Sequence, residues 1–206
     1  MTIGVLYHII NLMAGLHTMG YTMIKEIRPS IKVVVLCGAC QGEGLNKARH
    51  KFPNAKIYAI EPAKSNFDVM YAQFHKRPNM ELINKAIWTE NGTMCLNVYH
   101  APFAHSLYRK PHLEDKGKCK EREQVETMDF AEFLSQFGKN EVLLRMDVEG
   151  AEYEVLLHCF EKGVMDRVME LHIEFHAGWR IPELVKYKDK LDAKLKEWGK
   201  TVVKVQ

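Results

Sequence analysis

The stretch Ile31–Leu36 reads IKVVVL and is followed directly by Cys37–Gly44, which reads CGACQGEG. The first part is β-branched and apolar, which is typical of a strand buried on both faces of a parallel sheet. The second part is a glycine-rich turn, where the backbone can approach a ligand closely and the next helix offers free N–H groups. Its glycine spacing, G-x-x-x-G-x-G, differs from the G-x-G-x-x-G of dinucleotide folds and disfavours an NAD-dependent oxidoreductase.

Strands and helices alternate along the rest of the chain. The pattern predicts strands at 31–36, 56–60, 80–83, 142–146, 167–175 and 201–205, and helices ending near 51 and spanning 65–74, 129–137, 149–162 and 182–198. Asn91-Gly92 predicts a hairpin over 88–98, and the aperiodic residues 100–122 are expected to form a long loop. The alternation predicts an α/β fold: a doubly wound, Rossmann-like, mostly parallel sheet with helices on both faces, preceded by an N-terminal helix.

Length and composition favour a single soluble domain over the 206 residues. We divide it into an N-terminal helical segment (1–30), a core (31–177) and a C-terminal helix and strand (178–206). The net charge of +3 does not indicate a nucleic-acid partner. Residues 3–23 are apolar but interrupted by His8, Asn11 and His17, so we expect neither a signal peptide nor a membrane span. Five scattered cysteines favour a reduced, cytoplasmic protein.

Acidic side chains follow two of the predicted strands. Glu61-Pro62 ends the second strand, where a carboxylate can accept hydrogen bonds from the two hydroxyls of a ribose. Asp147 ends the buried strand at 142–146, and Glu149 opens the following helix, where the helix dipole favours a negative charge. Ligands of doubly wound sheets bind beyond these strand ends, so the three acids are candidate site residues.

His172, Glu174 and His176 alternate along the predicted strand at 167–175 and just beyond it, which places them on one face. Such a His-x-Glu-x-His arrangement can hold a metal. We prefer the interpretation that His172 is a core histidine and that Glu174 and His176 line the pocket, and we predict no metal site.

The segment Leu143–Leu156, LLRMDVEGAEYEVL, resembles the signature of the FkbM-type methyltransferases, roughly L-K-x-D-x-E-G-x-E-x-x-V-L. Further matches follow in the same order, and the resemblance covers about residues 31–177. They are Gly38-Ala39 and Gly42, Glu61-Pro62, Asn84–Trp88 with Asn91-Gly92, Ser106-Leu107, Thr127–Asp129 and Ile173–His176.

The resemblance implies a class I methyltransferase fold that binds S-adenosylmethionine (SAM). It assigns cofactor contacts to residues of three strand ends. Gly38, Ala39, Cys40 and Gly42 would cradle the methionine part, Glu61 with Pro62 would hold the ribose, and Ala86 and Ile87 would lie near the adenine.

The expected reaction is O-methylation of a hydroxyl on a sugar or other small metabolite, with a small molecule or glycan as the acceptor. The acceptor must lose a proton, and His176 is the expected base. Asp147 would lie at the methyl-transfer centre and orient the acceptor or help to bind a divalent metal, and Glu149 completes the catalytic set. The loop at 100–122 would cover the acceptor through His105, Ser106 and Tyr108.

Two alternatives come from other functional classes. Cys37 stands where the family usually has an acid, which keeps open a binding module that has the fold without turnover. Cys37 and Cys40 also form a C-x-x-C before a helix, a pattern found in thiol redox proteins.

Overall fold

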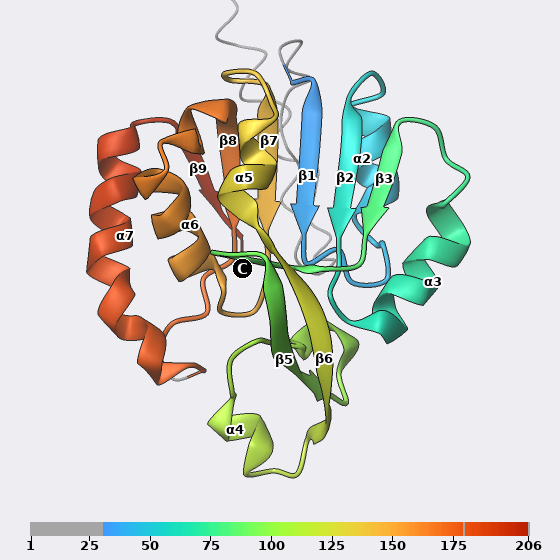
Figure 1. The fold of residues 1–206 in the computed structure, drawn as a ribbon, viewed down its shortest axis with the longest axis vertical. Coiled ribbons are helices and arrows are strands. Elements are labelled where there is room, and N and C mark those ends of the chain that lie inside the picture. The colour runs from blue at the N-terminus through green and yellow to red at the C-terminus, as the bar shows by residue number, and fades with distance from the viewer. Residues whose placement is uncertain (1–30, 179, 206) are drawn as a thin grey trace, which may run out of the picture.

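The computed structural model describes residues 31–178 and 180–205, so the predicted N-terminal helix lies outside the described residues. Six parallel strands form the main sheet in the order β3-β2-β1-β7-β8-β9 (Figure 1). They are β1 (Val33–Cys37), β2 (Lys56–Ile60), β3 (Met80–Ile83), β7 (Val142–Met146), β8 (Val168–Ile173) and β9 (Thr201–Lys204). The strand order reverses between β1 and β7, and in doubly wound sheets this is where a ligand binds.

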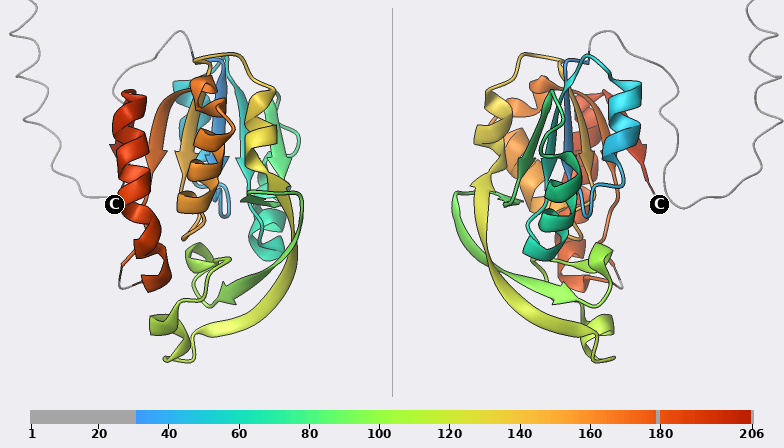
Figure 2. Two further views of the ribbon diagram at one scale, coloured as in Figure 1. Left: turned by 60° about the vertical axis from the view of Figure 1, so that its left-hand side comes forward. Right: turned by 90° about the vertical axis from the view of Figure 1, so that its right-hand side faces the viewer.

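Helices cover both faces of this sheet, as predicted. Alternate residues of β1 belong to two separate cores. Val33 and Val35 pack with α5 (Phe130–Ser135), α6 (Glu152–Glu161) and α7 (Val185–Trp198), and Val34 and Leu36 pack with α2 (Leu45–Lys51) and α3 (Lys64–Phe74). The right-hand view of Figure 2 shows α5 on one side of the sheet and α2 on the other.

A second, three-stranded sheet corrects the predicted hairpin and the predicted loop. β4 (Ala86–Trp88) does not pair with β5 (Gly92–Tyr99), because β6 (Cys119–Asp129) lies between them, parallel to β4 and antiparallel to β5. Residues 100–122 contain a 3₁₀ helix (Pro102–Ala104), the short helix α4 (Pro111–Glu114) and the start of β6. The first half of β6 is polar and largely exposed, with charged side chains at all of 120–123, so it lacks the apolar alternation that marks a strand. In Figure 1 this sheet lies below the carboxyl ends of the main strands.

The ends of two helices have local causes. Asp129 caps α5, because its carboxylate accepts hydrogen bonds from two main-chain N–H groups of the first turn. The helix predicted from Glu149 begins instead at Glu152. Glu149 and Gly150 have φ angles of +57° and +125°, which are incompatible with a right-handed helix.

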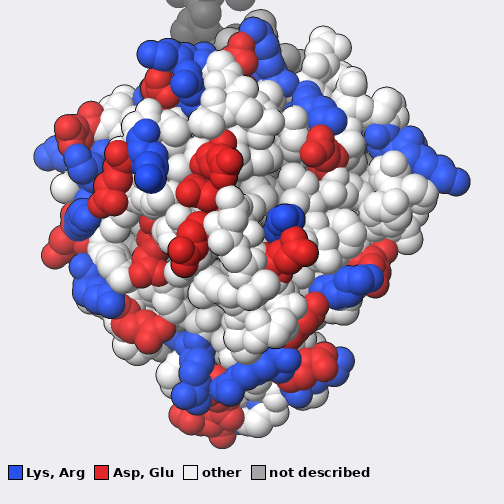
Figure 3. All heavy atoms as spheres, viewed as in Figure 1, with Lys and Arg blue, Asp and Glu red and all other residues white. Residues whose placement is uncertain are grey.

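The surface carries both signs of charge. On the face shown in Figure 3, Lys and Arg side chains are interspersed with Asp and Glu. This mixture agrees with the small net charge of +3.

Across 31–178 and 180–205, helices with the length and apolar character needed to cross a membrane are absent.

Candidate functional site

The site begins where the tips of β1 and β7 meet. The N–H of Asp147 donates to the carbonyl of Cys37 at 3.0 Å. A Cβ atom at Gly38 would lie 1.8 Å from the carbonyl oxygen of Asp147, and Gly38 has a φ of +77°. Only glycine satisfies both conditions. The glycine-rich turn is therefore held directly against the strand end that carries Asp147.

The N–H groups at the start of this turn are used within the protein and are not free for a ligand. Gly38 and Ala39 both donate to the carbonyl of Ile60 at 3.0 Å, and Cys40 donates to Oε2 of Glu61 at 2.9 Å. These hydrogen bonds hold the turn against the end of β2. What it presents to a ligand is a surface of small residues.

Glu61 is the buried carboxylate at the end of β2, with 4% of its surface exposed. Its Oε1 accepts a hydrogen bond from the N–H of Ala63 at 3.0 Å, and its Oε2 accepts from Cys40. Burial raises the pKa of Glu61 to about 7, although these N–H groups oppose the shift. The side chain of Asn66 also hydrogen-bonds this carboxylate, and a carboxylate with about four acceptor positions keeps capacity for a further donor.

A cavity of about 330 Å³ opens at these strand ends. It falls in the range of small-molecule sites, about 300–1,000 Å³. Most of the residues predicted from the sequence line it: Gly38, Ala39, Cys40, Glu61, Pro62, Ala86, Ile87, Asp147 and Glu149. Four residues that were predicted to lie in the site are not part of this lining: Gly42, Tyr108, Glu174 and His176. Gly42 instead packs against α3, where an added Cβ would lie 2.7 Å from the ring of Phe74.

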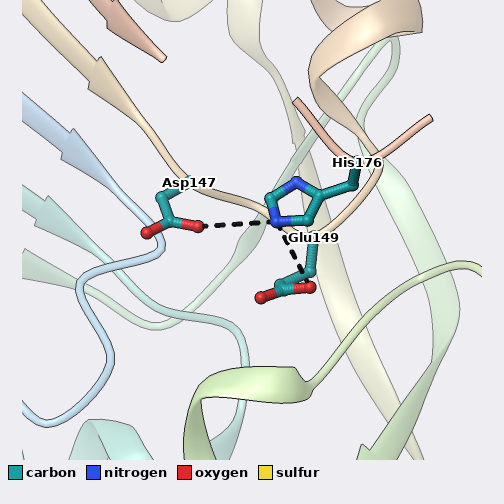
Figure 4. Close-up of side chains that lie close together, drawn as sticks. All are labelled: Asp147, Glu149 and His176. Atoms are coloured by element: carbon teal, nitrogen blue, oxygen red, sulfur yellow. Dashed lines mark ion pairs between the residues drawn. The ribbon is translucent and has the colours of Figure 1, made fainter. Parts of the chain in front are cut away.

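One end of the cavity is acidic. Nε2 of His176 lies 3.9 Å from Oδ1 of Asp147 and 3.4 Å from Oε2 of Glu149, and Figure 4 shows both carboxylates turned toward that nitrogen. The side chains of Asp147 and Glu149 are 28% and 17% exposed, whereas that of His176 is fully buried. Burial and the nearby Glu174 raise the pKa of Asp147 to about 6.

Glu152 fixes the His176 ring. Its Oε1 lies 3.0 Å from Nδ1 of His176 and also accepts the main-chain N–H of His176 at 2.8 Å. Its Oε2 accepts the N–H of Gly150 at 2.8 Å, and Glu152 is completely buried. Burial opposes protonation of His176, but Glu152 and the other carboxylates outweigh it and raise the pKa of the imidazole.

Two residues of the site escaped sequence reasoning. Glu152 belongs to the quoted motif, but an acidic residue in the first turn of a helix is also common without any functional role. Lys110, 2% exposed, binds Glu149 and donates to the carbonyl of Ala104 at 2.9 Å. Lys110 lies in the aperiodic segment, where the sequence carries no signal for a buried lysine.

The segment after β5 closes the cavity, but only part of its predicted set faces it. Phe103, with 71% of its surface exposed, and His105 line the cavity. Ser106 also lines it, yet its hydroxyl donates to the carbonyl of Glu149 at 2.6 Å. The hydroxyl of Tyr108 donates to Glu154 outside the cavity lining.

His172, Glu174 and His176, which alternate in the sequence, do not form one cluster in the structure. His172 is buried, with its Nε2 2.6 Å from Oε1 of Glu170, so it is a paired core histidine, as preferred from the sequence. Glu174 and His176 follow the strand rather than continue it. His176 groups with Asp147 and Glu149 instead of His172.

The cysteines lack the features of a redox pair. All five are free. Burial raises the pKa of the Cys37 thiol well above its ordinary value and, with Glu43 nearby, raises that of Cys40 to about 12. An active redox thiol needs the opposite shift.

The fold and the cavity at its topological switch define a Rossmann-like α/β protein with a cavity of small-molecule size. The family described as "Methyltransferase FkbM domain" matches residues 37–202. The chain therefore belongs to the FkbM methyltransferase family, as the sequence motifs indicated.

Among solved structures, the chain is similar to the methyltransferase FkbM from Methylobacillus flagellatus KT. The two are 15% identical, with a TM-score of 0.40, over 65% of this chain and 30% of that one. The chain thus spans less than a third of the length of that protein. No curated protein matches the sequence.

Proposed function

We propose that the protein is a SAM-dependent O-methyltransferase that acts on a hydroxyl of a sugar or other small metabolite. The observation that carries the proposal is the cavity itself. It has the buried carboxylate of Glu61 on one side and the partly exposed carboxylates of Asp147 and Glu149 on the other. Membership of a methyltransferase family gives the class of reaction.

The residues around Glu61 fit the adenosine part of the cofactor. Glu61 keeps acceptor capacity beyond its hydrogen bonds to Ala63, Cys40 and Asn66, which suits the hydroxyls of a ribose. Ala86 and Ile87, each 3% exposed, offer an apolar surface for the adenine. Gly38 and Ala39 leave room for the methionine part beside Asp147. SAM, when bound, supplies a methyl group on a positively charged sulfur.

Methyl transfer requires an acceptor oxygen in line with that methyl group. The acceptor hydroxyl gives its proton to a protein group, its oxygen bonds to the methyl carbon, and the carbon–sulfur bond breaks with its electron pair left on sulfur. We assign the contact with the acceptor to Asp147, because it lines the cavity. His176, predicted as the base, is fully buried behind Asp147 and Glu149, and we assign it the positioning of these two carboxylates.

Calorimetric titration with S-adenosylhomocysteine (SAH), the reaction product, tests cofactor binding. Turnover with a panel of glycans and hydroxylated metabolites then tests the reaction. Asp147→Asn should keep SAH affinity within a few-fold and lower turnover by about 100-fold or more. Glu81→Gln, which removes an exposed carboxylate on β3, is the matched control and should change neither.

Absence of SAH binding at millimolar concentration would refute the proposal. SAH binding with no turnover on any acceptor would favour the non-catalytic binding module.

A further inference from the structure

The acidic end of the cavity has an unsatisfied polar atom at its centre. Within the described residues, Nε2 of His176 is buried and has no hydrogen-bond partner. The position of this nitrogen is fixed, because Glu152 binds both the ring Nδ1 and the main-chain N–H of His176. A buried polar atom without a partner costs about 1–3 kcal/mol, so native proteins rarely leave one.

The tautomer of the ring determines what Nε2 offers. A hydrogen bond from Nδ1–H to Glu152 leaves Nε2 with a lone pair, and this carboxylate–histidine arrangement is the one that orients metal-binding histidines. Carboxylate oxygens of Glu149, Glu174 and Asp147 lie 3.4, 3.6 and 3.9 Å from Nε2. Ionised carboxylates are acceptors only. Lone pairs of three side chains therefore converge on one point.

The spacing suits a cation. The three ligand atoms lie within 4.8 Å of one another. In an octahedral site with ligands at about 2.1 Å, neighbouring ligand atoms lie about 3 Å apart and opposite ones about 4 Å apart. Binding needs shifts of less than about 1 Å, which partly exposed carboxylates can make.

Neighbouring charges leave the cluster acidic. Lys110 binds Glu149, Arg145 lies 3.6 Å from the far oxygen of Asp147, and Arg180 lies 3.5 Å from Glu174. Glu174 itself is 3.6 Å from Nε2 of His176. With Glu152, four carboxylates face three cationic side chains, which leaves one uncompensated negative charge when the imidazole is neutral.

We propose that Asp147, Glu149 and His176 bind a divalent cation of the Mn²⁺ type at the acceptor end of the cavity. One imidazole and two carboxylates form a mixed nitrogen and oxygen ligand set that suits such a cation. Lys110 shares Glu149 with it, and Glu152 orients the imidazole.

The consequence for the acceptor rests on the proposed function. Asp147 and Glu149 line the cavity, so the remaining coordination positions of the cation face the acceptor. A bound cation lowers the pKa of a coordinated hydroxyl and helps its proton to leave. The proton then passes to the Asp147 oxygen that does not bind the cation. Acceptors with two neighbouring oxygens, such as a vicinal diol, are favoured because both can coordinate.

Calorimetry with MnCl₂ and electron paramagnetic resonance of free Mn²⁺, on the full chain freed of metal with a chelator, test the site. We expect one Mn²⁺ per chain with micromolar affinity. Asp147→Asn and Glu149→Gln, both isosteric and at partly exposed positions, should each weaken binding at least about tenfold. Glu81→Gln should bind as the wild type does, and circular dichroism checks that all variants fold.

Two results would overturn the proposal: no saturable Mn²⁺ binding at millimolar concentration, or an affinity unchanged in both Asp147→Asn and Glu149→Gln. Absence of Mn²⁺ binding would mean that Nε2 of His176 carries a proton, which it donates to a neighbouring carboxylate. SAH titration of the metal-free chain is a separate measurement, so failure of the cation site and failure of the proposed function can be told apart.

Discussion

The pH dependence of cofactor affinity gives a sharp test of the role of Glu61. A carboxylate accepts hydrogen bonds from two ribose hydroxyls only when it is ionised. Burial places the pKa of Glu61 at about 7 in the free protein. Ligand affinity should therefore scale with the ionised fraction of Glu61, and it should rise as the pH rises through 7.

The size of the effect follows from that pKa. With a pKa of about 7, roughly a tenth of the molecules carry ionised Glu61 at pH 6 and about nine tenths at pH 8. The dissociation constant of SAH should fall about tenfold between these two values. Glu61→Gln, an isostere of the protonated acid, should bind weakly at every pH. Its loss at pH 8 is about 1–3 kcal/mol, the value of a lost hydrogen bond to a charged group.

The same ionisation affects the stability of the free protein. A raised pKa means that the folded state binds the proton more tightly than the unfolded state does. This contribution to stability is complete below pH 4.5 and is lost as the pH rises through about 7. It amounts to at most about 3 kcal/mol. Urea unfolding should show that wild type loses stability over this range relative to Glu61→Gln.

Calorimetric titration with SAH at several pH values, on wild type, Glu61→Gln and the control Glu81→Gln, measures the effect. Glu81 lies on the neighbouring strand and is exposed, so its variant should reproduce the wild-type slope. A wild-type affinity that changes less than twofold between pH 6 and pH 8 would refute the reasoning. A slope that persists in Glu61→Gln would assign the titration to another group.

Three further predictions concern the scaffold of the site. Gly38→Ala should destabilise the fold by more than about 3 kcal/mol in urea unfolding, because its Cβ would overlap a main-chain oxygen. Gly117→Ala, with a φ of +64° but no neighbour within 4 Å, should cost only about 1–2 kcal/mol, and equal costs would contradict the steric argument. Asp129→Ala should cost about 1–2 kcal/mol through the lost cap of α5, and a neutral effect would remove that role. Cys40 should label up to about a thousandfold more slowly at pH 8 than an ordinary thiol, judged against Cys40→Ser; rapid labelling would revive the redox alternative.

The strands that build the main sheet were predictable because they are buried on both faces. Lys56–Ile60 and Val142–Met146 agree with the sequence-based bounds. β6 was not predictable, because its charged and largely exposed first half has no hydrophobic period. Its pairing with β4 and β5 also depends on contacts distant in sequence. The missing strand also led to the wrong hairpin over 88–98.

The candidate site divides in the same way. Residues at the tips of predicted strands, such as Glu61 and Asp147, were found because the geometry of parallel sheets brings such tips together. Glu152 was underestimated because its partner, His176, is distant in sequence and lies just beyond the predicted strand at 167–175. Lys110 was missed because its burial results from the fold of an aperiodic segment.

In the structure, each acidic residue of the D-x-E-G-x-E motif has a separate role. Asp147 lines the cavity, and Glu149 is turned toward the same point by a left-handed backbone. Gly150 makes that turn next to Ile181, where a Cβ would lie 2.7 Å from the side chain. Glu152 closes the turn by binding the N–H of Gly150 and the ring and N–H of His176. The motif thus places two carboxylates, those of Asp147 and Glu149, in the cavity lining. The third carboxylate, that of Glu152, fixes the position of His176 behind them.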